Sequence, residues 1–246
     1  MTLRTDSLRL MAASDRVIFW DFDATLGERP GHWRGAVRDA LTEVLGEHEF
    51  TAGQIAGELM NGFPWHQPHL PHPQLSDPDE WWAHLAAALT EAVRRLGVPP
   101  GPAAEAATRV RSQFIDPASW RLFDDTLAAL DQLASLGWRH VVVSNHVPEL
   151  PAILASLGLD GYLADVVNSA VTGYEKPHPM AFRIALERAG HPRYAWMVGD
   201  NPVADIAGAT AVGLPAILVR TRPADGGRHI TSLAEVAELV CADGPR

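Results

Sequence analysis

The feature that most constrains the fold is a buried strand that runs directly into two carboxylates. Residues 16–26 read Arg-Val-Ile-Phe-Trp-Asp-Phe-Asp-Ala-Thr-Leu, and the β-branched and aromatic run over residues 17–22 predicts a strand. Asp21 and Asp23 are two residues apart, so both side chains should project to the same side. Two adjacent like charges are unfavourable unless a cation lies between or opposite them. The pair therefore indicates a ligand site at the strand's carboxyl end, although an Asx turn in which Asp23 bonds local backbone would also fit.

The second half of the chain alternates between strand and helix patterns. From Phe123 onward, strands are predicted over 139–143, 163–168, 195–198 and 215–219, and helices over 124–136, 149–157, 179–189, 202–211 and 232–240. Alternation at this spacing is typical of an α/β, doubly wound parallel sheet. We expect the strand over 17–22 to join this sheet.

The segment between the first strand and the second half of the chain has a different sequence pattern. Helical spacing of apolar residues covers 33–45, 51–60, 79–96 and 103–114, and no part of it is typical of a strand. Asp77-Pro78-Asp79-Glu80 is a favourable helix start, and the Gly- and Pro-rich run over 97–101 is a stop. We therefore expect a core of residues 1–26 and 119–246, with an all-helical domain over 27–118 inserted after the first strand.

Composition excludes several classes of function. The 246 residues carry a net charge of −10, from 30 acidic against 20 basic residues, which disfavours nucleic-acid and anionic-membrane partners. No stretch approaches the ~18 consecutive apolar residues of a membrane span, and residues 1–15 lack the apolar run of a signal peptide. The single Cys241 cannot form an intrachain disulfide. We expect a cytoplasmic protein with no nucleic-acid or membrane partner; monomer and dimer both remain open.

Polar residues stand at the ends of three predicted core strands. They are Asp21 and Asp23, Ser144 and Asn145, and the pair Gly199-Asp200. Parallel strands would bring these ends to one crevice. Lys176, the only lysine beside 19 arginines, precedes Pro177 in a loop that starts a helix. A solvated surface lysine is the ordinary interpretation, but this bias against lysine favours a specific role at the same crevice.

These elements together resemble the haloacid dehalogenase superfamily of phosphohydrolases. The resemblance rests on DxDxT at Asp21–Thr25, the strand-end Ser144, the Lys176-Pro177 pair and GDxxxxD at Gly199–Asp205, in this order. It covers the whole chain, and the helical insert is similar to the first cap type of that superfamily, which closes over the core and selects substrates. One departure is Ala24, where the family usually has Gly; an alanine costs little there if its φ stays negative.

The resemblance implies a mechanism and a cofactor. Asp21 would be the nucleophile that forms an aspartyl-phosphate, and Asp23 the general acid and base. Mg²⁺ would be held by Asp21, Asp200 and the Asp23 backbone carbonyl, with Asp205 supporting that shell or holding Lys176.

The phosphate of the substrate would contact a further group of residues. The resemblance places Thr25, Ser144, Lys176 and loop amides against the phosphoryl oxygens. Asn145 and Asn201 either join them or only cap turns. The expected activity is hydrolysis of a small phosphorylated metabolite.

Three other functions stay open at this point. A phosphomutase would use the same aspartyl-phosphate, and a phospho-accepting receiver module also combines acids, Ser or Thr and Lys on a doubly wound sheet. A non-catalytic binding protein that kept the fold is the third. Asp23 argues against a dehalogenase, which has no alkoxide leaving group to protonate.

The helical insert contains an unusual aromatic loop over residues 62–73. His66, His69 and His72 recur at spacing three, but the interleaved prolines forbid a helix that would place three zinc ligands on one face. We expect a stiff loop whose Trp65 and His66 either pack on the insert or face the substrate. His146 and His178 flank motif residues and either line the crevice or are hydrogen-bonded bystanders.

Overall fold

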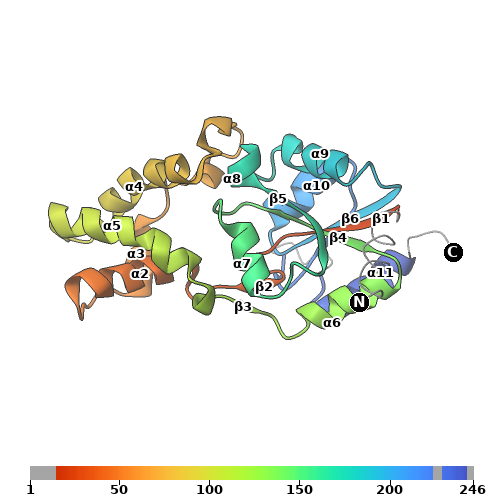
Figure 1. Cartoon of the computed structure of the whole chain (residues 1–246), viewed down its shortest axis with the longest axis horizontal. Helices are drawn as coiled ribbons and strands as arrows, with labels where there is room; N and C mark the ends of the chain where they lie inside the picture. Colours follow the sequence, from red (N-terminus) through yellow and green to blue (C-terminus); the bar gives the residue numbers. More distant parts are fainter. Residues whose placement is uncertain (1–14, 224–228, 243–246) are drawn as a thin grey trace.

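The computed structural model describes residues 15–223 and 229–242, and its core is one parallel sheet. The strand order is β5-β4-β1-β6-β7, and every adjacent pair runs parallel. The strands are β1 (Arg16–Trp20), β4 (Arg139–Ser144), β5 (Leu163–Asn168), β6 (Tyr194–Gly199) and β7 (Ala216–Leu218). All five predicted core strands are thus present, and β1, the strand with the two carboxylates at its end, lies at the centre (Figure 1).

Alternate side chains of β1 enter two separate apolar layers. Ile18 and Trp20 belong to one buried cluster with residues of α6 (Thr126–Ser135), α7 (Leu150–Ser156) and α11 (Val236–Ala242). Val17 and Phe19 belong to a second cluster with residues of α9 (Pro179–Arg188) and α10 (Gly208–Ala211). Because successive strand residues point to opposite faces, a continuous apolar run fits a sheet covered by helices on both sides. The doubly wound prediction is confirmed.

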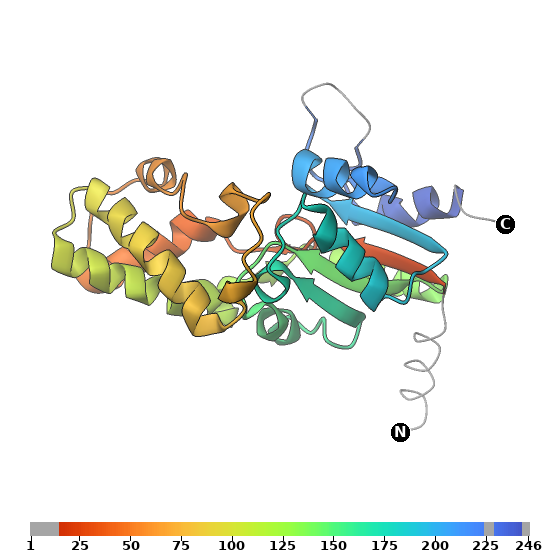
Figure 2. The same ribbon diagram turned by 90° about the horizontal axis from the view of Figure 1, so that it is seen from above.

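The helical insert forms a separate body beside the carboxyl edge of the sheet (Figures 1 and 2). Its helices are α2 (His32–Leu45), α3 (Ala52–Glu58), α4 (Pro78–Arg95) and α5 (Pro100–Ile115), with short 3₁₀ turns at Pro64–His66 and Pro73–Leu75. Its core is aromatic, and the Trp33 ring stacks on Phe114 with centroids 4.0 Å apart. Trp81 and Trp82 are both buried in α4. We call this helical body, residues 32–115, the cap.

Two short strands join the cap to the sheet. β2 (Gly27–Glu28) pairs antiparallel with β3 (Arg121–Leu122), so the outgoing and returning chains lie side by side. A Cβ at Gly27 would lie 2.8 Å from the Arg121 carbonyl oxygen, which explains why glycine stands here. The sequence did not predict this pair, because two-residue strands that meet across more than 90 residues carry no local pattern.

The remaining elements differ from prediction in detail. The predicted helix over 202–211 begins as a π-helix at Pro202–Ala207 before continuing as α10. The predicted last helix begins as a 3₁₀ turn at Leu233–Glu235, which precedes α11; two further short helices are α8 (Ser169–Thr172) and the 3₁₀ turn Pro117–Ser119. Among the described residues, no helix is long and apolar enough to cross a bilayer.

Trp20 of the central strand contacts a buried histidine, and this contact makes the free energy of unfolding sensitive to acid. Trp20 Nε1 donates to His140 Nδ1 at 3.1 Å, and His140 Nε2 lies 3.0 Å from the Leu130 carbonyl oxygen. The ring must therefore be neutral with its proton on Nε2, and burial lowers the pKa of His140 to about 4.

We expect this histidine to reduce the free energy of unfolding at low pH. As pH falls below 6.5, His140 of the unfolded chain takes up a proton before His140 of the folded protein does. The contribution of this histidine to the free energy of unfolding is therefore fully present above pH 6.5 and is lost between about pH 6.5 and pH 4. The full loss is about 3 kcal/mol. Urea unfolding at pH 7.5 and 4.5 should show a smaller pH effect in His140→Gln, which cannot titrate. An equal pH effect in both proteins would contradict this assignment.

Candidate active site

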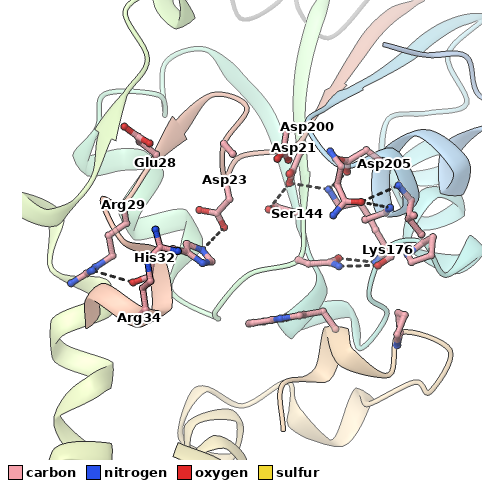
Figure 3. A pocket seen from close by; sticks show the side chains of 18 of the residues that line it. Asp21, Asp23, Glu28, Arg29, His32, Arg34, Ser144, Lys176, Asp200 and Asp205 are labelled. Carbon is pink, nitrogen blue, oxygen red and sulfur yellow. Dashed lines mark hydrogen bonds and ion pairs between the residues drawn. The ribbon is translucent and has the colours of Figure 1, made fainter. Parts of the chain in front are cut away.

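The first carboxylate after β1 is held by two side chains from other elements. Ser144, the last residue of β4, donates from Oγ to Asp21 Oδ1 at 2.8 Å. Lys176 Nζ lies 2.9 Å from the same oxygen. The two contacts leave Oδ2 of Asp21 without a described partner, on a side chain that is only 10% exposed. The structure therefore brings together three of the residues that the sequence predicted at this edge (Figure 3).

The lysine is fixed at both its charged end and its backbone. Its Nζ lies 2.6 Å from Asp205 Oδ1, and it is 3% exposed. Asn145 Oδ1 accepts from the Lys176 amide at 2.7 Å, and Asn145 Nδ2 donates to the Lys176 carbonyl at 2.9 Å. Burial alone would lower the pKa of Lys176, but Asp205 and Asp21 raise it above its ordinary value. Lys176 is thus a permanent buried cation, and Asn145 sets the course of its loop.

Three carboxylates form a cluster that suits a divalent cation. One oxygen from each of Asp21, Asp200 and Asp205 can be chosen so that all lie within 4.8 Å of one another. Asp200 has no ion-pair partner among the described residues; burial and repulsion from Asp21 and Asp205 raise its pKa to about 7. Carboxylate oxygens are donors that Mg²⁺ prefers, and one lysine cannot balance the charge of three carboxylates. The residues present therefore fit the cation that the sequence predicted.

A glycine makes room for the third acid. A Cβ at Gly199 would lie 2.2 Å from Asp205 Oδ2, so no larger residue could end β6 with Asp205 in this position. Asp205 also accepts from the Asn201 amide at 3.0 Å. Asn201 itself accepts from the amides of Val203 and Ala204, so its side chain caps the following helix.

The second carboxylate lies between two imidazoles. Asp23 Oδ2 is 3.4 Å from His32 Nε2, at the start of the cap, and 3.6 Å from His146 Nε2, in the loop after β4. Burial alone would raise the pKa of Asp23, but the two imidazoles lower it below its ordinary value. His146 is buried beside the site, whereas His178 accepts from the Met180 amide and caps α9. The sequence missed His32, because only the fold of the cap brings it to the motif.

The turn after Asp23 departs from one expectation. The φ of Ala24 is 57°, so the condition under which alanine costs little here, a negative φ, is not met. The chain reverses here, since the Ala24 amide donates to the Gly27 carbonyl and the Leu26 amide to the Phe22 carbonyl. Such a turn needs a left-handed residue, which costs alanine roughly 1–2 kcal/mol more than glycine. Thr25 is fully buried and is not among the residues that line the adjoining cavity.

A cavity of about 570 Å³ lies between the sheet edge and the cap. The core contributes the acidic and lysine side chains described above, and the cap together with the segment that leads into it contributes a different set: Glu28, Arg29, Gly31, His32, Arg34, Trp65 and Pro68. Figure 3 shows Glu28, Arg29, His32 and Arg34 on this side of the cavity. Trp65 of the aromatic loop thus lines the cavity and also packs on Phe63, with centroids 4.8 Å apart. His66 does not line it. The sequence analysis did not predict Arg29 or Arg34 here.

His72, the third histidine of the loop, connects the cap to the core through two hydrogen-bonding contacts. His72 Nε2 lies 3.0 Å from Glu175 Oε1, and both side chains are buried. The His72 amide also donates to the Gly173 carbonyl at 2.8 Å. A Cβ at Gly173 would lie 2.6 Å from Pro73, so the close contact of the two segments requires glycine. These contacts hold the cap directly beside the loop that carries Lys176.

Comparisons with known proteins agree with this geometry. A sequence model described as haloacid dehalogenase-like hydrolase matches residues 16–213. The mouse protein "Haloacid dehalogenase-like hydrolase domain-containing protein 3" is 33% identical over 142 residues, which cover 57% of this chain and 55% of that protein. A glyceraldehyde 3-phosphate phosphatase of Methanothermobacter thermautotrophicus is 37% identical over 129 residues, covering 48% of this chain and 57% of its own. The matches thus span little more than half the length of these curated relatives.

The fold is shared more widely than the sequence. The crystal structure of a HAD-hydrolase from Bacillus subtilis bound to magnesium superimposes with a TM-score of 0.69 at 18% identity. The alignment covers 92% of this chain and 98% of that one, so it includes both the sheet and the cap.

Proposed function

Because this chain belongs to the haloacid dehalogenase-like hydrolases, we propose that it is a Mg²⁺-dependent phosphatase of small phosphorylated metabolites. The observation that carries the proposal is the position of Asp21, whose Oδ1 is held by Ser144 and Lys176 beside a cluster of two further carboxylates. A carboxylate fixed at one oxygen presents the other to a substrate. The phosphatases among the relatives support the same reaction class.

The electrostatic problem of this reaction explains the residues around Asp21. A carboxylate that approaches a phosphate dianion to 4 Å meets roughly 8 kcal/mol of repulsion at an effective dielectric constant of 20. Lys176 Nζ, 2.9 Å from Asp21, supplies one compensating charge. The carboxylates of Asp21 and Asp200 and the Asp23 carbonyl would hold Mg²⁺, which offsets further phosphoryl charge when bound.

The two carboxylates after β1 then take different parts. Asp21 attacks phosphorus, the ester oxygen leaves, and an aspartyl-phosphate forms on Asp21. Asp23 gives its proton to the leaving oxygen and later takes one from the water that attacks the intermediate. Burial alone would raise the pKa of Asp23, but His32 and His146 lower it. An approaching phosphate dianion raises that pKa, so the substrate itself favours the protonated form needed in the first step.

The cap would select the ester group. Trp65 and Pro68 give the cavity an apolar wall opposite the carboxylates. Contacts to parts of the substrate that do not react can assist the reacting centre. The contact between His72 and Glu175 holds the apolar wall formed by Trp65 and Pro68 against the core.

We expect release of inorganic phosphate from a panel of small phosphate esters to depend on the metal. Excess chelator should stop the release, and Mg²⁺ should restore it. Ca²⁺ should inhibit, because its larger and more flexible coordination shell lets a carboxylate bind through both oxygens and removes the free nucleophile. Full activity in excess chelator, or no phosphate release from any ester with Mg²⁺, would contradict the proposal.

A further inference from the structure

The charged side chains of the cavity are paired with two exceptions. Glu28 accepts from Arg121 Nε at 2.9 Å, and Arg29 lies 2.8 Å from Asp39. Lys176 pairs with Asp21 and Asp205, and Asp23 lies against His32 and His146. Of the charged residues that line the cavity, only Asp200 and Arg34 have no ion pair or hydrogen bond to another side chain in the described parts of the chain.

The two unpaired charges belong to opposite walls. Asp200 follows β6 at the sheet edge, whereas Arg34 lies in the first turn of α2, next to Arg29 and His32 (Figure 3). The proposed metal accounts for Asp200. Nothing in the proposed phosphatase reaction accounts for Arg34, which lines the same cavity on the cap side.

The surroundings of Arg34 also favour a negative ligand. The first turn of α2 contains no acidic residue, and Gly31 at its N-cap offers no side chain to the free amides. Helix N-termini carry a partial positive charge, which adds to the charge of the guanidinium. A guanidinium presents two parallel donors that match the two oxygens of a carboxylate.

We propose that Arg34 binds a carboxylate of the substrate, so that the enzyme hydrolyses phosphate esters of small carboxylic acids. This inference rests on the proposed phosphatase function and names its substrate class. A single unpaired cation matches the −1 charge of a carboxylate, whereas a second phosphate of charge −2 would find no further free cation among the described residues of this wall. The cavity of about 570 Å³ limits the acid to a small molecule.

The test compares two esters that differ in one group. 3-Phosphoglycerate carries a carboxylate where glycerol 3-phosphate carries a hydroxymethyl group. Wild-type kcat/KM should be at least about 10-fold higher for the acid, and Arg34→Gln should lose about 10- to 100-fold more on the acid than on the alcohol, the range of a charged hydrogen bond. Arg38→Gln, on the same helix but outside the cavity lining, should preserve the preference.

Two further measurements separate the possible failures. Affinity for both esters should be measured by calorimetry in Asp21→Asn and Asp21→Asn/Arg34→Gln, since binding can be compared there without turnover. No carboxylate preference, or an equal loss on both esters in the Arg34 variants, would overturn the inference even if 4-nitrophenyl phosphate is hydrolysed. A greater Arg34-dependent loss for glycerol 1,3-bisphosphate would overturn it in favour of a second phosphate. Failure to hydrolyse 4-nitrophenyl phosphate with Mg²⁺ would instead contradict the phosphatase function itself.

Discussion

Asp21→Asn should lower kcat by about 10⁴-fold or more and abolish phosphorylation of the protein. The amide oxygen can still accept from Ser144, so the side chain should keep its place, but an amide is no nucleophile. Asp23→Asn should lower kcat by about 10²–10⁴-fold for a different reason, because it keeps the nucleophile and loses the proton donor and base. Circular dichroism should show that both variants are folded.

A good leaving group distinguishes these two losses. 2,4-Dinitrophenolate leaves without protonation, so 2,4-dinitrophenyl phosphate should still phosphorylate Asp23→Asn. The intermediate should then accumulate, since Asp23 is also needed to activate the water that removes it. Mass spectrometry of quenched protein should find one phosphate on Asp21 in Asp23→Asn and none in Asp21→Asn. Phosphate on a serine or histidine in either variant would exclude the mechanism.

The sequence predicted the core of this site because its geometry follows from local patterns. A parallel sheet brings the ends of its strands to one edge, so Asp21, Ser144 and Asp200 could be placed together from strand patterns alone. The scarcity of lysine singled out Lys176, and the structure places its Nζ between two of the predicted acids. The five core strands and the all-helical insert followed from the same periodicity.

The residues that sequence analysis missed depend on contacts between distant segments. His32 and Arg34 belong to the first turn of an ordinary amphipathic helix. The pairing of β2 with β3 and the contact of His72 with Glu175 place the start of this helix beside Asp21 and Asp23, and neither contact can be predicted from local sequence. The left-handed conformation of Ala24 follows from a turn closed by Gly27. Thr25 matches the motif but is buried outside the cavity lining, since the turn after Asp23 carries it into the core.

Lys176→Met should reduce both the activity and the free energy of unfolding more than a substitution of any other cationic residue that lines the cavity. The variant removes a charge that lies 2.9 Å from Asp21 and 2.6 Å from Asp205 and replaces it with an apolar chain of similar length. Removing one partner of a buried ion pair lowers the free energy of unfolding by roughly 3–5 kcal/mol. kcat/KM should fall by about 10³-fold, and equally for an aryl phosphate and for the preferred ester, because Lys176 acts at the phosphoryl end.

The pH dependence of unfolding should reveal the origin of that loss. Burial and mutual repulsion already raise the pKa values of Asp200 and Asp205, and the charge of Lys176 opposes that shift, so without Lys176 these pKa values in the folded protein should rise further above those in the unfolded chain. Such groups destabilise the fold when ionised, and that destabilisation is relieved as pH falls through their raised pKa values. Urea unfolding of Lys176→Met should therefore recover part of the lost free energy between pH 8 and pH 5, relative to wild type.

Asn145→Ala provides the matched control for this interpretation. It removes both hydrogen bonds between Asn145 and the Lys176 backbone but keeps the ammonium group. If the charge of Lys176 is what matters, this variant should lose far less activity than Lys176→Met and should not show its recovery of stability at low pH. Equal losses in both variants, with the same pH dependence, would mean that the course of the loop rather than the buried charge supports the site.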